Sequence, residues 1–170
     1  IVWRDAITQY FLRMSGIPDT KGRAGHYPGR FEAEYARLTG YTVMDATPWE
    51  DASRGKAVTC QGRLSCAAEW TYSGAAGRYD IAVQYFDVQG GVATFVLMVN
   101  GKPVTAWSAD AALPSWRPNG DNSTRFTARG VELKPGDVIR VEGTPDRSDP
   151  AALDYIEVDP AATTQVPAAQ

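Results

Sequence analysis

The chain has 170 residues, 44% of them hydrophobic, a length that suits one domain with attached ends better than two domains. Its formal net charge is -3 with acidic and basic residues interspersed, so it offers no basic face for a phosphate backbone. No apolar run approaches the roughly 20 residues that cross a bilayer. We therefore expect neither nucleic acid nor a membrane as a partner.

The first 30 residues differ in pattern from the rest of the chain. Apolar side chains recur at three- and four-residue spacings at Ile7, Tyr10, Phe11 and Met14. This spacing predicts an amphipathic helix over residues 3–14, which Gly16 and Pro18 then end. Residues 20–30 are rich in Gly, Pro and basic residues and are predicted to be a linker. The chain does not begin with Met, and we interpret it as a fragment or a processed product.

From residue 31 the apolar residues recur with a period of two, which is typical of β-strands. The predicted strands cover residues 31–38, 56–60, 66–70, 79–86, 93–99, 104–107, 123–128, 138–143 and 153–158. Asn100-Gly101 predicts a tight hairpin. Short strands at nearly regular spacing indicate an all-β protein, an antiparallel β-sandwich or jelly roll over residues 31–159. Residues 160–170 lack a core-forming pattern and are predicted to be a disordered tail.

The two cysteines, Cys60 and Cys66, flank a segment of Gly and short polar residues that suits a turn. A disulfide across this turn would imply an oxidising compartment, either secreted or periplasmic. Two buried thiols in neighbouring strands are the alternative. A zinc site is disfavoured, because one His and two Cys do not supply four ligands.

Five segments resemble carbohydrate-binding modules of families 6 and 35, in the order found there. They are residues 31–34 (FEAE), 77–85 (GRYDIAVQY), 99–101 (VNG), 133–137 (LKPGD) and 153–158 (LDYIEV). Residues 10–19 (YFLRMSGIPD) and 25–28 (GHYP) are similar to the end of glycoside hydrolase family 67 α-glucuronidases. The resemblance implies that residues 1–30 are the helical tail of an upstream catalytic domain plus a linker. The parent would be a xylan α-1,2-glucuronidase acting on hemicellulose.

The resemblance also implies a structural calcium ion held by Glu32, Glu34 and Asp154. Residues i and i+2 of a strand point the same way, so the two glutamates would present carboxylates to one point. Carboxylate and carbonyl oxygens suit calcium, and carbonyls near residues 53–56 could complete the shell. The alternative is a solvent-facing edge whose glutamates are hydrated or paired with Arg37 or Lys56.

Sugar binding needs flat aromatic faces and planar polar side chains placed in loops. The candidates are Tyr41, Trp49, Trp116, Asn119, Asp121 and Asn122. Trp116 lies in a loop-like segment, where it would either stack on a sugar or fold back to cover the end of the sandwich. Arg117 and Arg125 could pair with a uronate carboxylate, although surface solvation is the commoner role.

One position departs from the family pattern. Many family members carry a sugar-contacting Asn directly before the closing Leu-Asp, whereas this chain has Ala152. The domain would then bind through another surface, bind weakly, or only support the hydrolase.

Catalysis by this chain is not expected. The single His, His26, lies in the predicted linker, and Glu32 and Glu34 would be neighbours rather than carboxylates facing each other across a cleft. Two hypotheses follow. The preferred one is a non-catalytic module that directs a hemicellulose-degrading enzyme to xylan, glucuronoxylan or a related plant cell-wall polysaccharide. The alternative is a structural or self-association domain of the parent hydrolase that binds no sugar.

Overall fold

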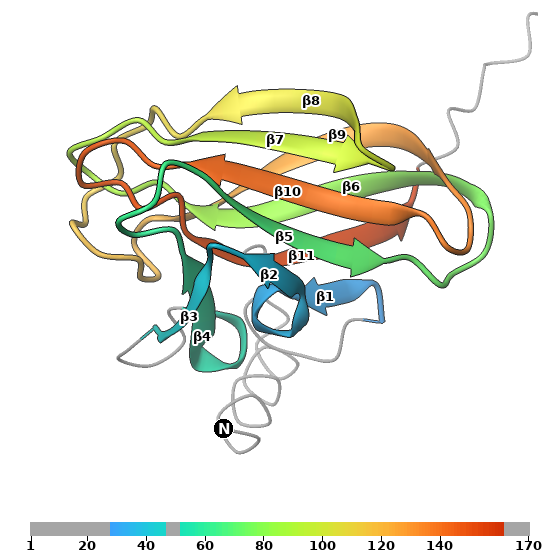
Figure 1. Cartoon of the computed structure of the whole chain (residues 1–170), viewed down its shortest axis with the longest axis horizontal. Coiled ribbons are helices and arrows are strands. Elements are labelled where there is room, and N and C mark those ends of the chain that lie inside the picture. The colour runs from blue at the N-terminus through green and yellow to red at the C-terminus, as the bar shows by residue number, and fades with distance from the viewer. Residues whose placement is uncertain (1–27, 47–51, 162–170) are drawn as a thin grey trace, which may run out of the picture.

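The computed structural model describes residues 28–46 and 52–161, and in this part the chain forms two antiparallel sheets that pack face to face (Figure 1). The first sheet has the order β3-β4-β11-β6-β9, with β1 also paired to β11. Its strands are β1 (Arg30–Glu32), β3 (Thr42–Asp45), β4 (Lys56–Thr59), β6 (Gly77–Phe86), β9 (Ser123–Leu133) and β11 (Leu153–Pro160). The predicted all-β antiparallel sandwich is therefore confirmed, and the predicted helix at residues 3–14 lies outside the described residues.

The second sheet has the order β2-β5-β10-β7-β8. Its strands are β2 (Arg37–Thr39), β5 (Cys66–Thr71), β7 (Thr94–Val99), β8 (Lys102–Ser108) and β10 (Val138–Thr144). The hairpin predicted at Asn100-Gly101 joins β7 to β8, and both residues have the positive φ that such a tight turn requires. In the described part of the chain, no helix is long and apolar enough to cross a membrane.

The core lies between the sheets and contains an aromatic layer that joins them. Tyr85 of β6 packs on Phe95 of β7, with ring centroids 5.0 Å apart. Trp107 of β8 stacks on Phe126 of β9 at 4.4 Å with the rings parallel to within 1°. Because β8 and β9 are the outer strands of different sheets, this stack closes one side of the sandwich.

The prediction of one continuous strand over residues 31–38 is wrong, because this segment forms two short strands separated by a turn. β1 ends at Glu32, a 3-10 turn η1 (Ala33–Tyr35) follows, and β2 starts at Arg37. The chain turns here because β1 pairs with β11 in the first sheet, whereas β2 pairs with β5 in the second. The strand β3, which the sequence analysis did not predict, forms a hairpin partner for β4.

The connections divide between the two ends of the sandwich. Residues 60–65, 87–93, 109–122 and 145–152 form what we call the loop end, and residues 72–76, 100–101 and 134–137 form the turn end (Figure 1). β10 runs between the two ends, since Val138 pairs with Thr71 and Gly143 pairs with Cys66. Segments that are distant in sequence therefore meet at the loop end.

Candidate functional site

The loop end contains a pocket of about 360 Å³. We call it the Trp116 pocket. Its lining includes Trp116, Arg117 and Pro118 from the β8–β9 loop, and Pro145, Arg147, Ser148, Asp149 and Pro150 from the β10–β11 loop. Further lining comes from Gln61 and Gly62 in the β4–β5 loop and from Met44 of β3. Trp116 is 64% exposed, although it is a large aromatic residue. The indole therefore offers an accessible apolar surface at the rim of a hollow.

Two asparagines shape the loop that carries Trp116. Asn122 is fully buried; its side-chain amide donates to the carbonyls of Ser115 (3.2 Å) and Arg117 (3.0 Å), and its Oδ1 accepts from the amide of Asn119 (3.0 Å). Asn119 donates through Nδ2 to Ser115 Oγ at 2.7 Å. Because these amides are occupied by the loop itself, both residues fix its shape and so hold Trp116 in place.

The other predicted sugar contacts are placed differently. Tyr41 is 5% exposed, lies in the core and donates its hydroxyl to the Ala151 carbonyl at 2.9 Å, so its ring faces are covered. Asp121 is exposed on the same loop as Trp116. Trp49 lies outside the described residues. Ala152 is fully buried in a small apolar cluster.

Arginine side chains give the Trp116 pocket a cationic lining. Arg117 and Arg147 both line it, whereas Arg125 lies elsewhere and donates to Gln84 Oε1 and to the Tyr155 hydroxyl, each at 3.0 Å. Arg147 was not predicted as a site residue. The order of the predicted strands could have indicated it. The segment before the last strand, which carries Arg147, must return to the same end of the sandwich as the Trp116 loop.

A buried carboxylate lies in the wall of the same pocket. Asp149 is fully buried; its oxygens accept from the amides of Ala151 (2.9 Å) and Val88 (3.4 Å). Burial raises the pKa of Asp149 to about 6, and the charge of Asp87 adds to this effect. These hydrogen bonds anchor the β10–β11 loop, which carries Arg147, to the start of the β6–β7 loop.

The three predicted calcium ligands lie in one region beside the first sheet. Glu32 ends β1, Glu34 lies in η1, and Asp154 is the second residue of β11. Glu32 and Asp154 are buried, and Asp154 is completely so. The E-x-E argument from strand alternation does not hold, because Glu34 is in a 3-10 turn, but the charges of the three carboxylates still act on one another. Burial and, after it, the charge of Glu32 raise the pKa of Glu34 to about 7.

Glu34 and Asp154 have few hydrogen-bond donors around them in the described part of the chain, which is a feature of oxygen ligands for a cation. Both carboxylate oxygens of Glu34 are buried without a hydrogen-bond partner among the described residues. Burial, and then the charges of Glu32 and Glu34, raise the pKa of Asp154 well above its usual range. Buried oxygen ligands of this kind fit a hard cation such as calcium. As the side chains stand, the described residues contain no group of three or more His, Cys, Asp or Glu residues placed to hold a metal ion.

The expected alternative partners of these glutamates are engaged elsewhere. Arg37 forms an ion pair with Glu69, and Lys56 forms one with Asp45. Arg54 of the 3-10 turn η2 (Ser53–Gly55) lies 3.4 Å from Glu32 instead, and Ser53 Oγ donates to Glu32 at 2.7 Å. Segment η2 therefore contacts the acidic group at the position where its carbonyls were expected to contribute.

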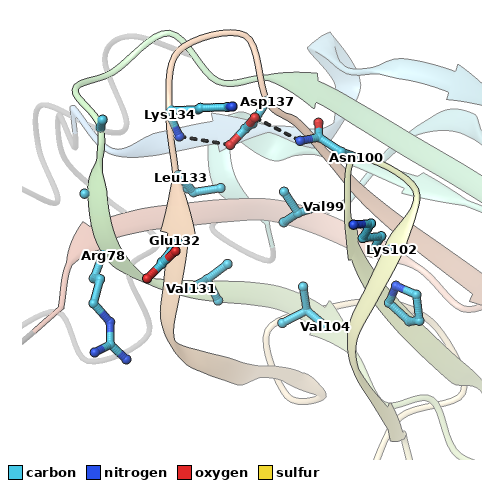
Figure 2. Close-up of a pocket in the computed structure, with 13 residues that line it drawn as sticks. Arg78, Val99, Asn100, Lys102, Val104, Val131, Glu132, Leu133, Lys134 and Asp137 are labelled. Carbon is cyan, nitrogen blue, oxygen red and sulfur yellow. Dashed lines mark hydrogen bonds between the residues drawn. The ribbon is translucent and has the colours of Figure 1, made fainter.

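A second hollow of about 730 Å³ lies near the turn end, between the outer strands β8 and β9 (Figure 2). Its apolar lining is aliphatic and comprises Val99, Pro103, Val104, Val131 and Leu133. Lys102 and Lys134 lie at its edge, and Asp137 is held by Asn100 and by the Lys134 amide, as the dashed lines in Figure 2 show. No aromatic residue of the described part of the chain lines this hollow. It is therefore a poorer surface for stacking a pyranose ring than the Trp116 pocket.

Cys60 and Cys66 are joined in a disulfide, with their Cα atoms 5.7 Å apart. The bridge closes the β4–β5 loop, whose residues Gln61 and Gly62 line the Trp116 pocket. Leu64, within the closed ring, is 93% exposed. The disulfide thus constrains one wall of the candidate site.

Comparison with solved structures defines the class of this domain. A family 35 carbohydrate-binding module from Clostridium thermocellum superposes with a TM-score of 0.58 at 18% identity, covering 78% of this chain and 97% of that module. The Podospora anserina GH26-CBM35 β-(1,4)-mannanase gives a TM-score of 0.59 at 25% identity, covering 81% of this chain and 28% of the mannanase. The fold is that of family 35 carbohydrate-binding modules.

Sequence comparison gives a closer relationship. The chain is 40% identical over 162 residues to the probable alpha-glucuronidase A of Aspergillus flavus, a match that covers 92% of this chain and 19% of the relative. No protein-family model matches the chain. The chain is homologous to a segment of fungal alpha-glucuronidase A and spans about a fifth of the length of these relatives. The predicted resemblance to family 35 modules and to α-glucuronidases is thereby confirmed.

Proposed function

We propose that this domain is a non-catalytic carbohydrate-binding module that binds xylan or glucuronoxylan at the Trp116 pocket. The observation that carries the proposal is Trp116, a residue that is 64% exposed and lines a pocket formed by three loops together with β3 and β4. Trp116 is held in solvent on a loop whose shape Asn119 and Asn122 fix, so its large apolar side chain gains little from burial. This arrangement is typical of a residue whose ring face binds a ligand. A sugar ring stacked on it would bury apolar surface on both partners.

The arginines favour an acidic sugar as part of the ligand. Arg117 and Arg147 line the pocket together with Trp116, and a guanidinium can bind a carboxylate through two parallel hydrogen bonds. A glucuronic acid side group on xylan supplies such a carboxylate next to a pyranose face. The homology to a segment of alpha-glucuronidase A supports the same substrate class, since an enzyme of that name acts on glucuronic acid linkages.

We further propose that the longer protein is a secreted or periplasmic α-glucuronidase in which this domain accompanies an upstream catalytic domain. The disulfide supports an oxidising compartment. The domain itself carries no activity in this proposal. A structural calcium ion would be held by Glu32, Glu34 and Asp154, where it would neutralise buried negative charge and fix η1 and β11 relative to each other.

A structural or self-association role without sugar binding is the second candidate. Two observations favour it, because Ala152 occupies the position where many family members have a sugar-contacting Asn, and Tyr41 is buried. Native affinity gels distinguish the two candidates. The purified domain would be run through glucuronoxylan, arabinoxylan, β-glucan, xyloglucan and pectin, with and without calcium, beside an inert protein. Retardation in glucuronoxylan supports the module, and unchanged migration in every gel supports the structural role.

A further inference from the structure

The β6–β7 loop, residues 87–93, contributes no residue to the lining of the Trp116 pocket, yet it contacts both of the long loops that do. On one side, the amide of Gln89 donates to the carbonyl of Ser115 at 2.9 Å. On the other side, the amide of Val92 donates to Asp146 Oδ2 at 3.0 Å. The β6–β7 loop is thus hydrogen-bonded to both of the long loops that line the pocket.

Gly90 is in direct contact with the indole of Trp116. A β-carbon placed on Gly90 would lie 2.4 Å from Cζ3 and 3.1 Å from Cη2 of the tryptophan ring. Real β-carbons essentially never come within 3.0 Å of a heavy atom outside their own residue and its chain neighbours. The ring edge therefore occupies the space that any larger residue at position 90 would need. Gly90 also has a φ of 93°, a conformation that glycine adopts at little cost.

Gly91 leaves space for the other lining loop, the β10–β11 loop, in the same way. A β-carbon at this position would lie 1.9 Å from the carbonyl oxygen of Asp146 and 3.0 Å from the amide nitrogen of Asp149. The backbone of the β10–β11 loop therefore lies directly against Gly91. Two adjacent residues without side chains let both walls approach the same backbone.

We infer that Gly90 is a positioning residue for the Trp116 indole. One edge of the indole packs against Gly90, and this contact sets the orientation of the ring in the Trp116 pocket. This inference rests on the proposed function for its consequence in binding, but not for the placement of the ring. Gly90 would not contact the ligand. Its effect on affinity would pass entirely through Trp116.

The test compares Gly90→Ala with Gly136→Ala. Gly136 has a φ of 92°, nearly that of Gly90, and nothing lies within 4 Å of a β-carbon placed there. Both substitutions therefore place an alanine at nearly the same positive φ, but only Gly90→Ala drives a methyl group into the indole. The readout is the indole N–H cross-peak of Trp116 in a ¹⁵N–¹H spectrum, assigned from its absence in Trp116→Phe, together with retardation in glucuronoxylan gels.

We expect Gly90→Ala to shift the Trp116 cross-peak and to weaken polysaccharide binding at least tenfold, while Gly136→Ala changes neither. An unchanged Trp116 cross-peak in Gly90→Ala would overturn the inference. If the wild-type domain binds no polysaccharide, the proposed function fails, and the cross-peak alone still decides whether Gly90 positions the ring.

A double variant covers the case in which Gly90→Ala does not fold. The clash disappears when the ring is removed, so Gly90→Ala combined with Trp116→Ala should fold and lose no more stability than Gly136→Ala combined with Trp116→Ala. A Gly90→Ala/Trp116→Ala protein that remains unfolded would contradict the inference.

Discussion

The backbone amide of Ser53 lies 3.0 Å from both carboxylate oxygens of Asp154. Among the described residues, this N–H supplies a small share of the hydrogen bonding that a completely buried carboxylate needs, and the negative charges of Glu32 and Glu34 also repel the Asp154 carboxylate. A bound calcium ion would offset this repulsion. We therefore predict that calcium stabilises the wild-type domain by about 2.7 kcal/mol when its concentration is 100 times the dissociation constant.

The control for this prediction is Asp154→Asn, which keeps the shape of the side chain and removes its charge. Thermal unfolding would be followed in calcium and in excess chelator. We expect the melting temperature of the wild type to rise by several degrees in calcium and that of Asp154→Asn to stay nearly constant. Equal melting temperatures of the wild type in both solutions would exclude a structural ion.

The pKa of Asp149 predicts a specific dependence of stability on pH. Burial raises this pKa from 3.8 to about 6, so between these pH values the unfolded chain has lost the proton and the folded chain keeps it. The free energy of unfolding therefore falls as the pH rises from about 4 to 6, by about 3 kcal/mol for this group. Urea unfolding at pH 4 and pH 7 would measure the fall.

Other carboxylates also change the free energy of unfolding with pH. The quantity to compare is therefore the difference in this free energy between the wild type and Asp149→Asn. We expect this variant to gain relative stability on going from pH 4 to pH 7. Asp121→Asn, in which an exposed carboxylate is changed, serves as the matched control and should follow the wild type. A constant difference between wild type and Asp149→Asn across this range would show that folding does not raise the pKa of Asp149.

The disulfide should contribute modestly to stability. Cys60 and Cys66 are six residues apart, and closing so short a ring in the unfolded chain is worth about 2 kcal/mol. The double variant Cys60→Ala/Cys66→Ala should lose about this much in urea unfolding and become insensitive to reductant. If the wild type and the double variant had the same midpoint, the bridge would not constrain the unfolded chain.

The sequence predicted the sandwich well because its signals are local. Alternating apolar residues along β6 and the Asn100-Gly101 turn each act over a few residues, and each was placed correctly. The break between β1 and β2 was missed for a different reason. It arises because the chain changes sheets at η1, and a change of sheet depends on strands more than 100 residues away, such as β11.

The candidate site was only partly predictable for the same reason. Trp116 could be singled out, because a tryptophan in an aperiodic segment lacks a core explanation. The roles of Asn119 and Asn122 could not be read in advance, since an amide that fixes its own loop and an amide that faces a ligand look alike in sequence. Arg147 and Gly90 join the site only through packing between loops that are distant in the chain.

The most direct test of the account is retardation of Trp116→Ala in glucuronoxylan gels. Lys102→Ala is the matched control, because Lys102 lines the aliphatic hollow near the turn end and is absent from the Trp116 pocket. Expected dissociation constants for the wild type are roughly micromolar to millimolar. We expect the wild type and Lys102→Ala to be retarded equally and Trp116→Ala to migrate with the inert protein. Equal retardation of Trp116→Ala and the wild type would contradict this expectation.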